Sequence, residues 1–177
     1  MSEPTLPLSE AWTWWYYNST IQDPSYVPWD VYTFDDVGSF WSMYNNVKGP
    51  KAIPAGASYY LLKEGVKPKL EDNREGGRWI ITTKAKERDT KLTKYWLDLL
   101  LASIGNIFED SDDLQGVSVS IRKTGDRFAV WLSSAKSSRE ILRVGEHLKT
   151  ILDLEGKIHF YSNRGELEGN HTPLYTI

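Results

Sequence analysis

Two arginines flank the dipeptide Thr124-Gly125, which is typical of a tight turn between two strands. With this dipeptide as the turn, Arg122 lies opposite Arg127, and Ser118 lies opposite Trp131. Like charges directly opposite each other destabilise a sheet by roughly a few tenths of a kcal/mol or more, and a bound anion would reverse that sign. The pattern indicates either a phosphate site with an aromatic group beside it, or a solvated face on which both arginines extend into water.

The residues between these positions alternate with them. They are all apolar and form the opposite face of the same two strands: Val117, Val119, Ile121, Phe128, Val130 and Leu132. Because side chains alternate along a strand, this face is expected to pack against helices, and the face with the arginines is expected to remain open.

The spacing of apolar residues changes repeatedly along the chain. In some segments every second residue is apolar, as in a strand, and in others every third or fourth residue is apolar, as in a helix. Eight strands are expected, near residues 11–17, 31–34, 59–63, 78–83, 117–123, 127–133, 158–161 and 174–177. Three helices are expected: one capped by Asp35 or Asp36, one over 91–104 that ends at a left-handed Gly105, and one over 138–152. This order predicts an α+β fold, with one antiparallel sheet and helices on one of its faces.

The length and composition of the chain limit the functions that it could have. The 177 residues suit a single domain over 1–177, with 1–10 as a flexible or extended arm. The net charge of -3 argues against a protein that coats long nucleic acids, although a small basic site remains open. Cysteine is absent, which excludes disulfides and thiolate metal sites and suits a reducing compartment. No secretory signal or membrane-spanning stretch is evident, so no membrane partner is expected.

The chain has eight tryptophans and ten tyrosines, well above the usual share for tryptophan. Large rings dominate buried cores, and a tryptophan-rich core is the simpler interpretation. A platform on which a base stacks is the alternative.

Enzymatic chemistry finds little support. His147, His159 and His171 are scattered without metal-ligand spacing. The acidic run that contains Asp110, Asp112 and Asp113 lacks the glycine and the terminal glutamate of a calcium loop. We therefore expect no catalytic residues, no metal and no cofactor.

Several segments, in order and spacing, resemble the eukaryotic translation initiation factor 4E family. They cover nearly the whole chain: Pro7-Leu8, WTWWYY at 12–17, FDDVGSFW at 34–41, Glu71-Asp72, GGRW at 76–79, YWLDLL at 95–100, residues 116–131 and LYTI at 174–177. The resemblance implies a curved antiparallel sheet of about eight strands with three helices on the convex face. It also implies a monomeric protein that binds the 7-methylguanosine cap of messenger RNA.

The resemblance also assigns residues to the cap site. Glu71 would accept hydrogen bonds from the guanine edge, because a carboxylate suits two parallel N–H donors. Trp131 would contact the methyl group. Arg122 and Arg127 would hold the phosphates, with Lys123 as a weaker candidate.

In the cap site, two positions depart from the family pattern. The family places the base between two tryptophans, and the one that precedes the Glu-Asp pair is Leu70 here. The other ring comes from the loop after the first strand, where either Tyr26 or Trp29 could serve. Leucine keeps apolar contact but loses the cation–π attraction to a methylated guanine, which is worth roughly 0.5–2 kcal/mol. We expect the cap affinity to be about tenfold weaker than that of a Leu70→Trp variant.

The second expected helix is apolar on more than one side, since Leu97 and Leu101 form a stripe beside its core stripe. A helix buried all round is the simpler interpretation. In the family, a dorsal groove receives a short helix from a factor 4G-type scaffold or a 4E-binding protein. The resemblance assigns to it Pro7, Val37, Trp41, Leu97 and Leu101, with Asp98 as a polar contact at its edge. Leu6 stands where the family has a histidine.

Two functions follow from the resemblance. The first is cap binding together with recruitment of a factor 4G-type scaffold to start translation. The alternative is a translational repressor or interaction module of the same fold with weakened cap binding. In either case we expect a cytoplasmic protein, with a nuclear fraction also open.

Overall fold

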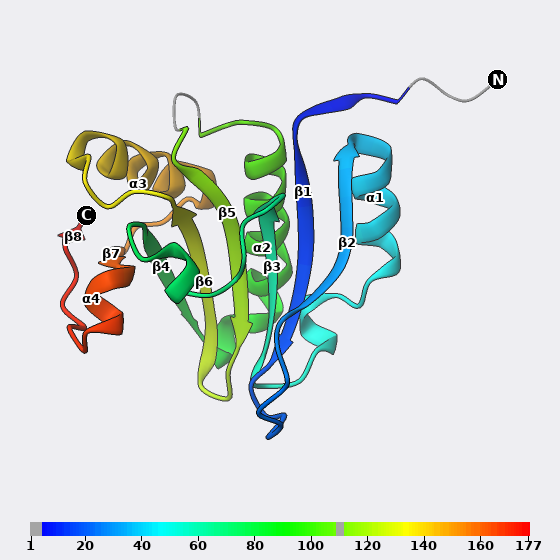
Figure 1. Ribbon diagram of the computed structural model, residues 1–177, viewed down its shortest axis with the longest axis horizontal. Coiled ribbons are helices and arrows are strands. Elements are labelled where there is room, and N and C mark those ends of the chain that lie inside the picture. Colours follow the sequence, from blue (N-terminus) through cyan, green and yellow to red (C-terminus); the bar gives the residue numbers. More distant parts are fainter. Residues whose placement is uncertain (1–4, 109–111) are drawn as a thin grey trace.

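Eight strands form one antiparallel sheet in a computed structural model that describes residues 5–108 and 112–177 (Figure 1). Their order across the sheet is β2-β1-β3-β5-β6-β4-β7-β8. The strands are β1 Pro7–Asn18, β2 Trp29–Asp36, β3 Ala57–Lys63, β4 Gly77–Lys84, β5 Leu114–Ile121, β6 Gly125–Leu132, β7 His159–Ser162 and β8 Tyr175–Thr176. The expected arm over residues 1–10 overlaps β1, because that strand begins at Pro7.

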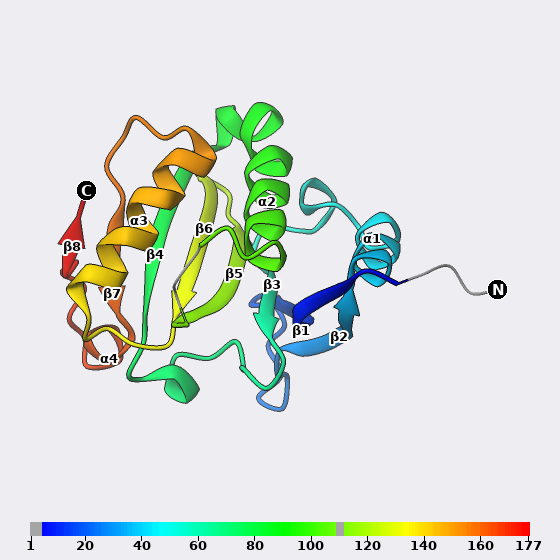
Figure 2. The same ribbon diagram turned by 90° about the horizontal axis from the view of Figure 1, so that it is seen from above.

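Long helices cover one face of the curved sheet. They are α1 Val37–Asn46, α2 Arg88–Ile104 and α3 Ser138–Leu152, and Figure 2 shows α2 and α3 lying over the same face. The apolar side chains of β5 and β6 that alternate with the arginines all belong to the core beneath these helices. The predicted fold class is therefore confirmed, and so is the prediction of which face is buried.

A fourth helix, α4 Asn163–Leu167, lies in the described chain and was not predicted. It contacts β4, β7 and the short 3₁₀ turn at Glu71–Asn73. Five residues, one of them a glycine, are too few to produce a detectable helical period.

Individual side chains explain where the helices α1 and α2 begin or end. Asp36 caps α1, because its Oδ1 accepts a hydrogen bond from the Ser39 backbone N–H at 2.9 Å. Helix α2 starts three residues before the predicted Lys91. Gly105 at its C-terminus is not left-handed, with φ of -83°. The left-handed residue is Asn106, which can adopt that conformation through its short polar side chain.

The β5–β6 hairpin turns one residue earlier than predicted. Ile121 pairs with Asp126, and the Arg122 N–H donates to the Gly125 carbonyl at 3.0 Å, so the loop is Lys123-Thr124. Arg127 therefore lies opposite Ser120 and not opposite Arg122. This arrangement avoids the direct like-charge pair that the sequence predicted. Moving the turn by one residue shifts the pairing by two, so every side chain keeps its predicted face.

Of the acidic run before β5, Asp110 lies outside the described residues. Asp113 has a structural role, because its side chain accepts a hydrogen bond from the Ser133 hydroxyl at 3.0 Å. Within residues 5–108 and 112–177, no helix is long and apolar enough to cross a membrane, and no group of three or more acidic or histidine side chains could hold a metal ion.

One buried carboxylate connects the hairpin to the helix layer. Asp126, at the start of β6, has a fully buried side chain. The Arg88 guanidinium, at the first residue of α2, donates to both of its oxygens at 2.9–3.1 Å. The same guanidinium donates to the Arg122 carbonyl at 2.6 Å. Arg88 thus positions the turn that carries Arg122 and Lys123.

We predict that Arg88→Leu lowers the free energy of unfolding by about 3 kcal/mol, because it leaves a buried carboxylate without its partner. Urea denaturation measures this change. The control is Lys91→Leu, which removes a solvent-exposed pair with Glu87 and should leave the free energy of unfolding almost unchanged. Equal losses in the two variants would contradict this role for Arg88.

Candidate functional site

A cavity of about 570 Å³ opens on the helix-free face of the sheet. Its walls come from strands β1 and β3, the loop before β2 and the segment around the 3₁₀ turn. The lining residues are Tyr17, Tyr26, Pro28, Tyr60, Pro68, Lys69, Leu70, Glu71 and Asp72. A concave site of this volume, with several rings and a few charged groups, is typical of a small-ligand pocket.

Tyr26 is held in place on one side of this cavity. Its ring stacks on Tyr17 with centroids 5.5 Å apart, and its hydroxyl accepts a hydrogen bond from the Asn18 N–H at 3.1 Å. Asp23 shapes the preceding turn, since its Oδ1 accepts from the Ser25 N–H at 2.9 Å. The side-chain and backbone hydrogen bonds from Ser25 lower the pKa of Asp23.

Trp29, the other candidate ring, lies elsewhere. It is the first residue of β2 and is 66% exposed. It lines a separate apolar pocket of about 420 Å³ with Trp14 and Tyr59, which belong to the core on the helix side. Of the two candidates, Tyr26 shares the cavity with Leu70 and Glu71, and Trp29 does not.

Leu70 and Glu71 sit at the start of the 3₁₀ turn Glu71–Asn73, which buried Asn73 anchors. The Asn73 Nδ2 donates to the carbonyls of Lys67 at 2.7 Å and Lys69 at 2.6 Å. Leu70 is half-buried and Glu71 is exposed at the cavity. The sequence did not identify Asn73 as the residue that positions this wall.

Trp131 lies on the predicted face, but its ring is buried. It is 3% exposed and packs in a small cluster with Leu70 and Tyr60, which do line the cavity. Its Nε1 donates to the Ser118 hydroxyl at 3.0 Å. In this structure Trp131 therefore supports the cavity wall, and contact with a methyl group would require side chains around the ring to move.

Two of the three predicted basic residues, Arg122 and Lys123, lie in a pocket that adjoins the cavity, whereas Arg127 lines neither space. Arg122 and Lys123 are exposed at the hairpin tip and line a neighbouring pocket of about 430 Å³. Tyr17 and Tyr60 line both pockets, so the two are adjacent. Arg127 is half-buried in the middle of the sheet, between β5 and β4.

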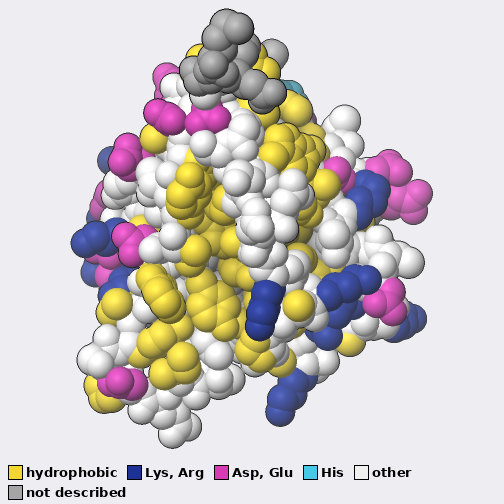
Figure 3. Space-filling view, turned by 90° about the vertical axis from the view of Figure 1, so that its right-hand side faces the viewer, with side chains coloured by type: hydrophobic (Ala, Val, Ile, Leu, Met, Phe, Trp, Pro, Cys, Tyr) yellow, Lys and Arg dark blue, Asp and Glu magenta, His cyan; other side chains and the backbone are white. Residues whose placement is uncertain are grey.

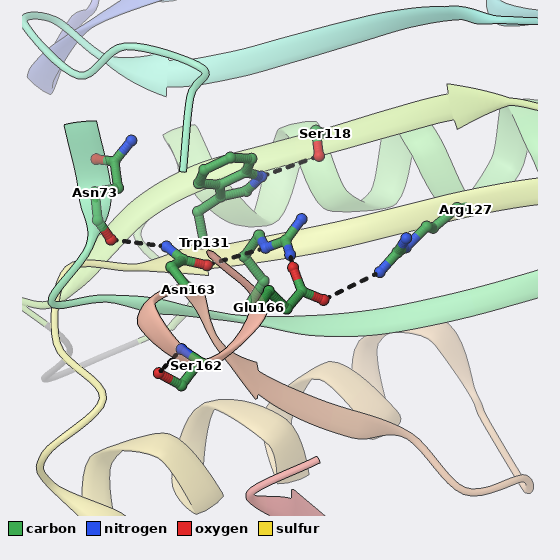
Figure 4. Close-up of polar contacts among 9 residues, drawn as sticks. Asn73, Ser118, Arg127, Trp131, Ser162, Asn163 and Glu166 are labelled. Carbon is green, nitrogen blue, oxygen red and sulfur yellow. Dashed lines mark hydrogen bonds and ion pairs between the residues drawn. The ribbon is translucent and has the colours of Figure 1, made fainter. Parts of the chain in front are cut away.

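A further arginine, Arg78 on β4, was not predicted as a site residue. It pairs in register with Trp131, and its guanidinium lies 5.3 Å from the centre of that indole. Glu166 of α4 forms an ion pair with Arg127 at 3.9 Å, which Figure 4 draws as a dashed line. Glu166 also forms a close ion pair with Arg78. The alternation of the β4 strand could have placed Arg78 on this face, but nothing in the sequence indicated Glu166.

The charges on this face influence one another. Burial lowers the pKa of the Arg78 guanidinium, and the Glu166 carboxylate opposes that shift. Burial also lowers the pKa of Arg127, and the nearby positive charge of Arg122 adds to the effect. Each direction is the expected one, because desolvation and like charges both disfavour an ionised group. The face thus concentrates positive charge beside the cavity.

The residues predicted for a dorsal groove lie at the surface on the helix side. Pro7 begins β1, Val37 and Trp41 lie on α1, and Leu97, Asp98 and Leu101 lie on α2. Trp41 is 37% exposed, and the two leucines are half-buried. Asp98 already has a partner, Lys94, at 2.7 Å. Figure 3 shows hydrophobic side chains gathered on the adjoining side of the molecule, where α1 and β2 lie.

Leu6, at the position of the family's histidine, uses its backbone here. Its carbonyl accepts a hydrogen bond from the Val37 N–H at 2.9 Å. This bond joins the segment before β1 to the first residue of α1, while the Leu6 side chain remains exposed. The connection therefore does not depend on the residue type.

Known structures share this architecture. An Ascaris suum eIF4E-3 solved with an m7G cap superposes with a TM-score of 0.90 at 33% identity, and the match covers 98% of each chain. The Caenorhabditis elegans eIF4E-3 in complex with the 4E-binding protein Mextli gives a TM-score of 0.87 at 30% identity, over 98% of this chain and 100% of that one.

Similarity in sequence points to the same group of proteins as similarity in structure. Human eukaryotic translation initiation factor 4E is 34% identical over 160 residues, which are 86% of this chain and 73% of the human protein. The Drosophila melanogaster factor 4E1 is 36% identical over 151 residues, and the match spans 84% of this chain and only 58% of the fly protein. Residues 7–175 match the family model described as eukaryotic initiation factor 4E. The chain belongs to the eukaryotic initiation factor 4E family.

Proposed function

We propose that this protein binds the 7-methylguanosine cap of messenger RNA in the cavity of the helix-free face. The observation that carries the proposal is the meeting of Tyr26, Leu70 and Glu71 around one cavity, with basic residues beside it. A flat cationic base fits the cavity with its ring and carboxylate, and a phosphate chain attached to that base fits the basic residues beside it. The Ascaris suum relative of the same fold was solved with that cap.

Each wall has a separate role in this proposal. The Tyr26 ring stacks on the methylated base, which is worth about 1–3 kcal/mol for a base on an aromatic ring. The Glu71 carboxylate accepts two parallel N–H groups of the guanine edge, and the positive charge of the methylated ring strengthens these bonds. Leu70 closes the other side by apolar contact. Arg122 and Arg127 attract the phosphates, with Lys123 further out.

Tryptophan fluorescence titration with 7-methyl-GTP and with GTP tests the proposal. We expect at least a tenfold preference for the methylated nucleotide, equivalent to about 1.4 kcal/mol. Equal and weak quenching by both nucleotides would instead support the alternative function, an interaction module that has lost cap binding.

Two variants locate the site in the same titration. Tyr26→Ala should weaken binding of 7-methyl-GTP by about tenfold or more, since it removes the stacking ring. Trp29→Ala is the matched control, because it removes an exposed ring that lines the other pocket, and it should leave the affinity unchanged. A loss of 7-methyl-GTP affinity in the Trp29 variant alone would overturn the placement of the base beside Tyr26.

Leu70 leaves the slot aromatic on one side only. A Leu70→Trp variant should bind 7-methyl-GTP about tenfold more tightly than the natural protein, because a second ring adds cation–π attraction to the methylated base. The gain should be smaller for GTP, whose base is uncharged. The same affinity in both proteins would show that residue 70 does not face the base.

We further propose that the surface of α1 and α2 receives a short helix from a factor 4G-type scaffold or a 4E-binding protein. Support comes from the exposed and half-buried apolar residues there and from the Caenorhabditis elegans relative in complex with Mextli. Apolar anchors on an amphipathic helix suit such a groove. Whether the partner promotes or represses translation depends on which of the two binds.

Trp41→Ala should weaken binding of a 4E-binding peptide by about tenfold or more, because exposed tryptophans at interfaces are frequent anchors. Fluorescence anisotropy of a labelled peptide measures this. Leu174→Ala is the control, since it removes a comparably exposed apolar side chain beside β8, at the far edge of the sheet. Unchanged peptide binding in a folded Trp41 variant would refute the groove assignment.

A further inference from the structure

A carboxylate of the protein itself occupies the basic face. Glu166 places one oxygen against the Arg78 guanidinium. Its other oxygen lies 3.9 Å from Arg127, and Figure 4 draws this ion pair. The Glu166 side chain is only 15% exposed, so the contact is largely removed from water. The two arginines deepest in this face are therefore already paired with an anion before any ligand arrives.

The position of Glu166 is fixed by the site around it. Neighbouring Asn163 is buried, accepts a hydrogen bond from the Arg78 Nε at 3.1 Å and donates to the Asn73 carbonyl at 2.8 Å. The Ser162 hydroxyl caps α4 by accepting from the Gly165 N–H at 3.2 Å. Because α4 is joined both to Arg78 and to the turn that carries Glu71, Glu166 is a built part of this face.

An internal anion changes what a phosphate can contribute. A phosphate chain that reaches unpaired arginines gains their full attraction, whereas one that meets an existing pair must displace the carboxylate or lie beside it. Either event subtracts from the gain, since the displaced carboxylate loses its partners and an undisplaced one repels the phosphate. The base, bound at Tyr26 and Glu71, is unaffected by this exchange.

We propose that Glu166 competes with the phosphate chain for Arg78 and Arg127, and so limits the share of the affinity that phosphates supply. This inference deepens the cap-binding function proposed above and rests on it. Its consequence is specific. The base sets the ratio of the 7-methyl-GTP affinity to the GTP affinity, which Glu166 leaves unchanged, whereas Glu166 holds down the affinity of every ligand that binds through its phosphates.

The test compares Glu166→Gln with Glu168→Gln by calorimetric titration. Both changes remove one negative charge from the same short region, but Glu168 is exposed, follows α4 directly and has no ion pair among the described residues. The probes are 7-methylguanosine, 7-methyl-GTP and inorganic tripolyphosphate. Circular dichroism checks that both variants are folded.

Glu166→Gln should bind 7-methyl-GTP and tripolyphosphate about tenfold more tightly than the natural protein and bind 7-methylguanosine equally well. Glu168→Gln should change none of these affinities by more than about twofold. Equal gains in the two variants, or no gain in the Glu166 variant, would overturn the proposal. Absence of 7-methylguanosine binding in all three proteins would contradict the cap site itself, whereas tripolyphosphate still reports on Glu166 in that case.

Discussion

Alternation of side chains along the paired strands β5 and β6 decides which residues of this hairpin are buried and which reach the open face. Six apolar residues of the hairpin enter the core under α2 and α3, which forces their neighbours onto the open face. Arg127 and Trp131 reach that face for this reason. The buried Arg88–Asp126 pair then ties the hairpin to the helix layer.

The open face has to hold several positive charges close together. Its own residues reduce the repulsion, because Arg127 lies opposite Ser120 and pairs with Glu166, while Arg78 lies across the Trp131 ring. The short helix α4 connects these charges to the wall that contains Glu71, through the hydrogen bond between Asn163 and Asn73. The wall that contains Glu71 and the arginines of the open face are thus joined to each other through α4.

Much of the fold could be predicted because its signals are local and repeated. Periods of two and of three to four located eight strands and three helices, and Ser138–Leu152 was predicted with its observed bounds. The register of the hairpin could not be predicted to the residue, because Lys123-Thr124 and Thr124-Gly125 are both acceptable turns. Placing the turn one residue too late did not change the face of the sheet on which each side chain lies, because the cross-strand pairing shifts by two residues.

The site was less predictable, because its details depend on contacts between distant segments. No local pattern shows that Tyr26 folds back onto Tyr17 while Trp29 enters the edge strand with its ring in another pocket. Burial of Trp131 depends on Leu70 and Tyr60, which are remote in sequence. Glu166 lies in a helix too short to be recognised, and its role depends on two arginines that are more than thirty residues away.

A crystal structure of the complex with 7-methyl-GTP would show where the cap binds. We expect the methylated base between Tyr26 and Leu70, with its edge on the Glu71 carboxylate and its phosphates toward Arg127 and Arg122. A nucleotide bound in the pocket of Trp29, or one whose base lies outside the cavity with only its phosphates held, would contradict this placement.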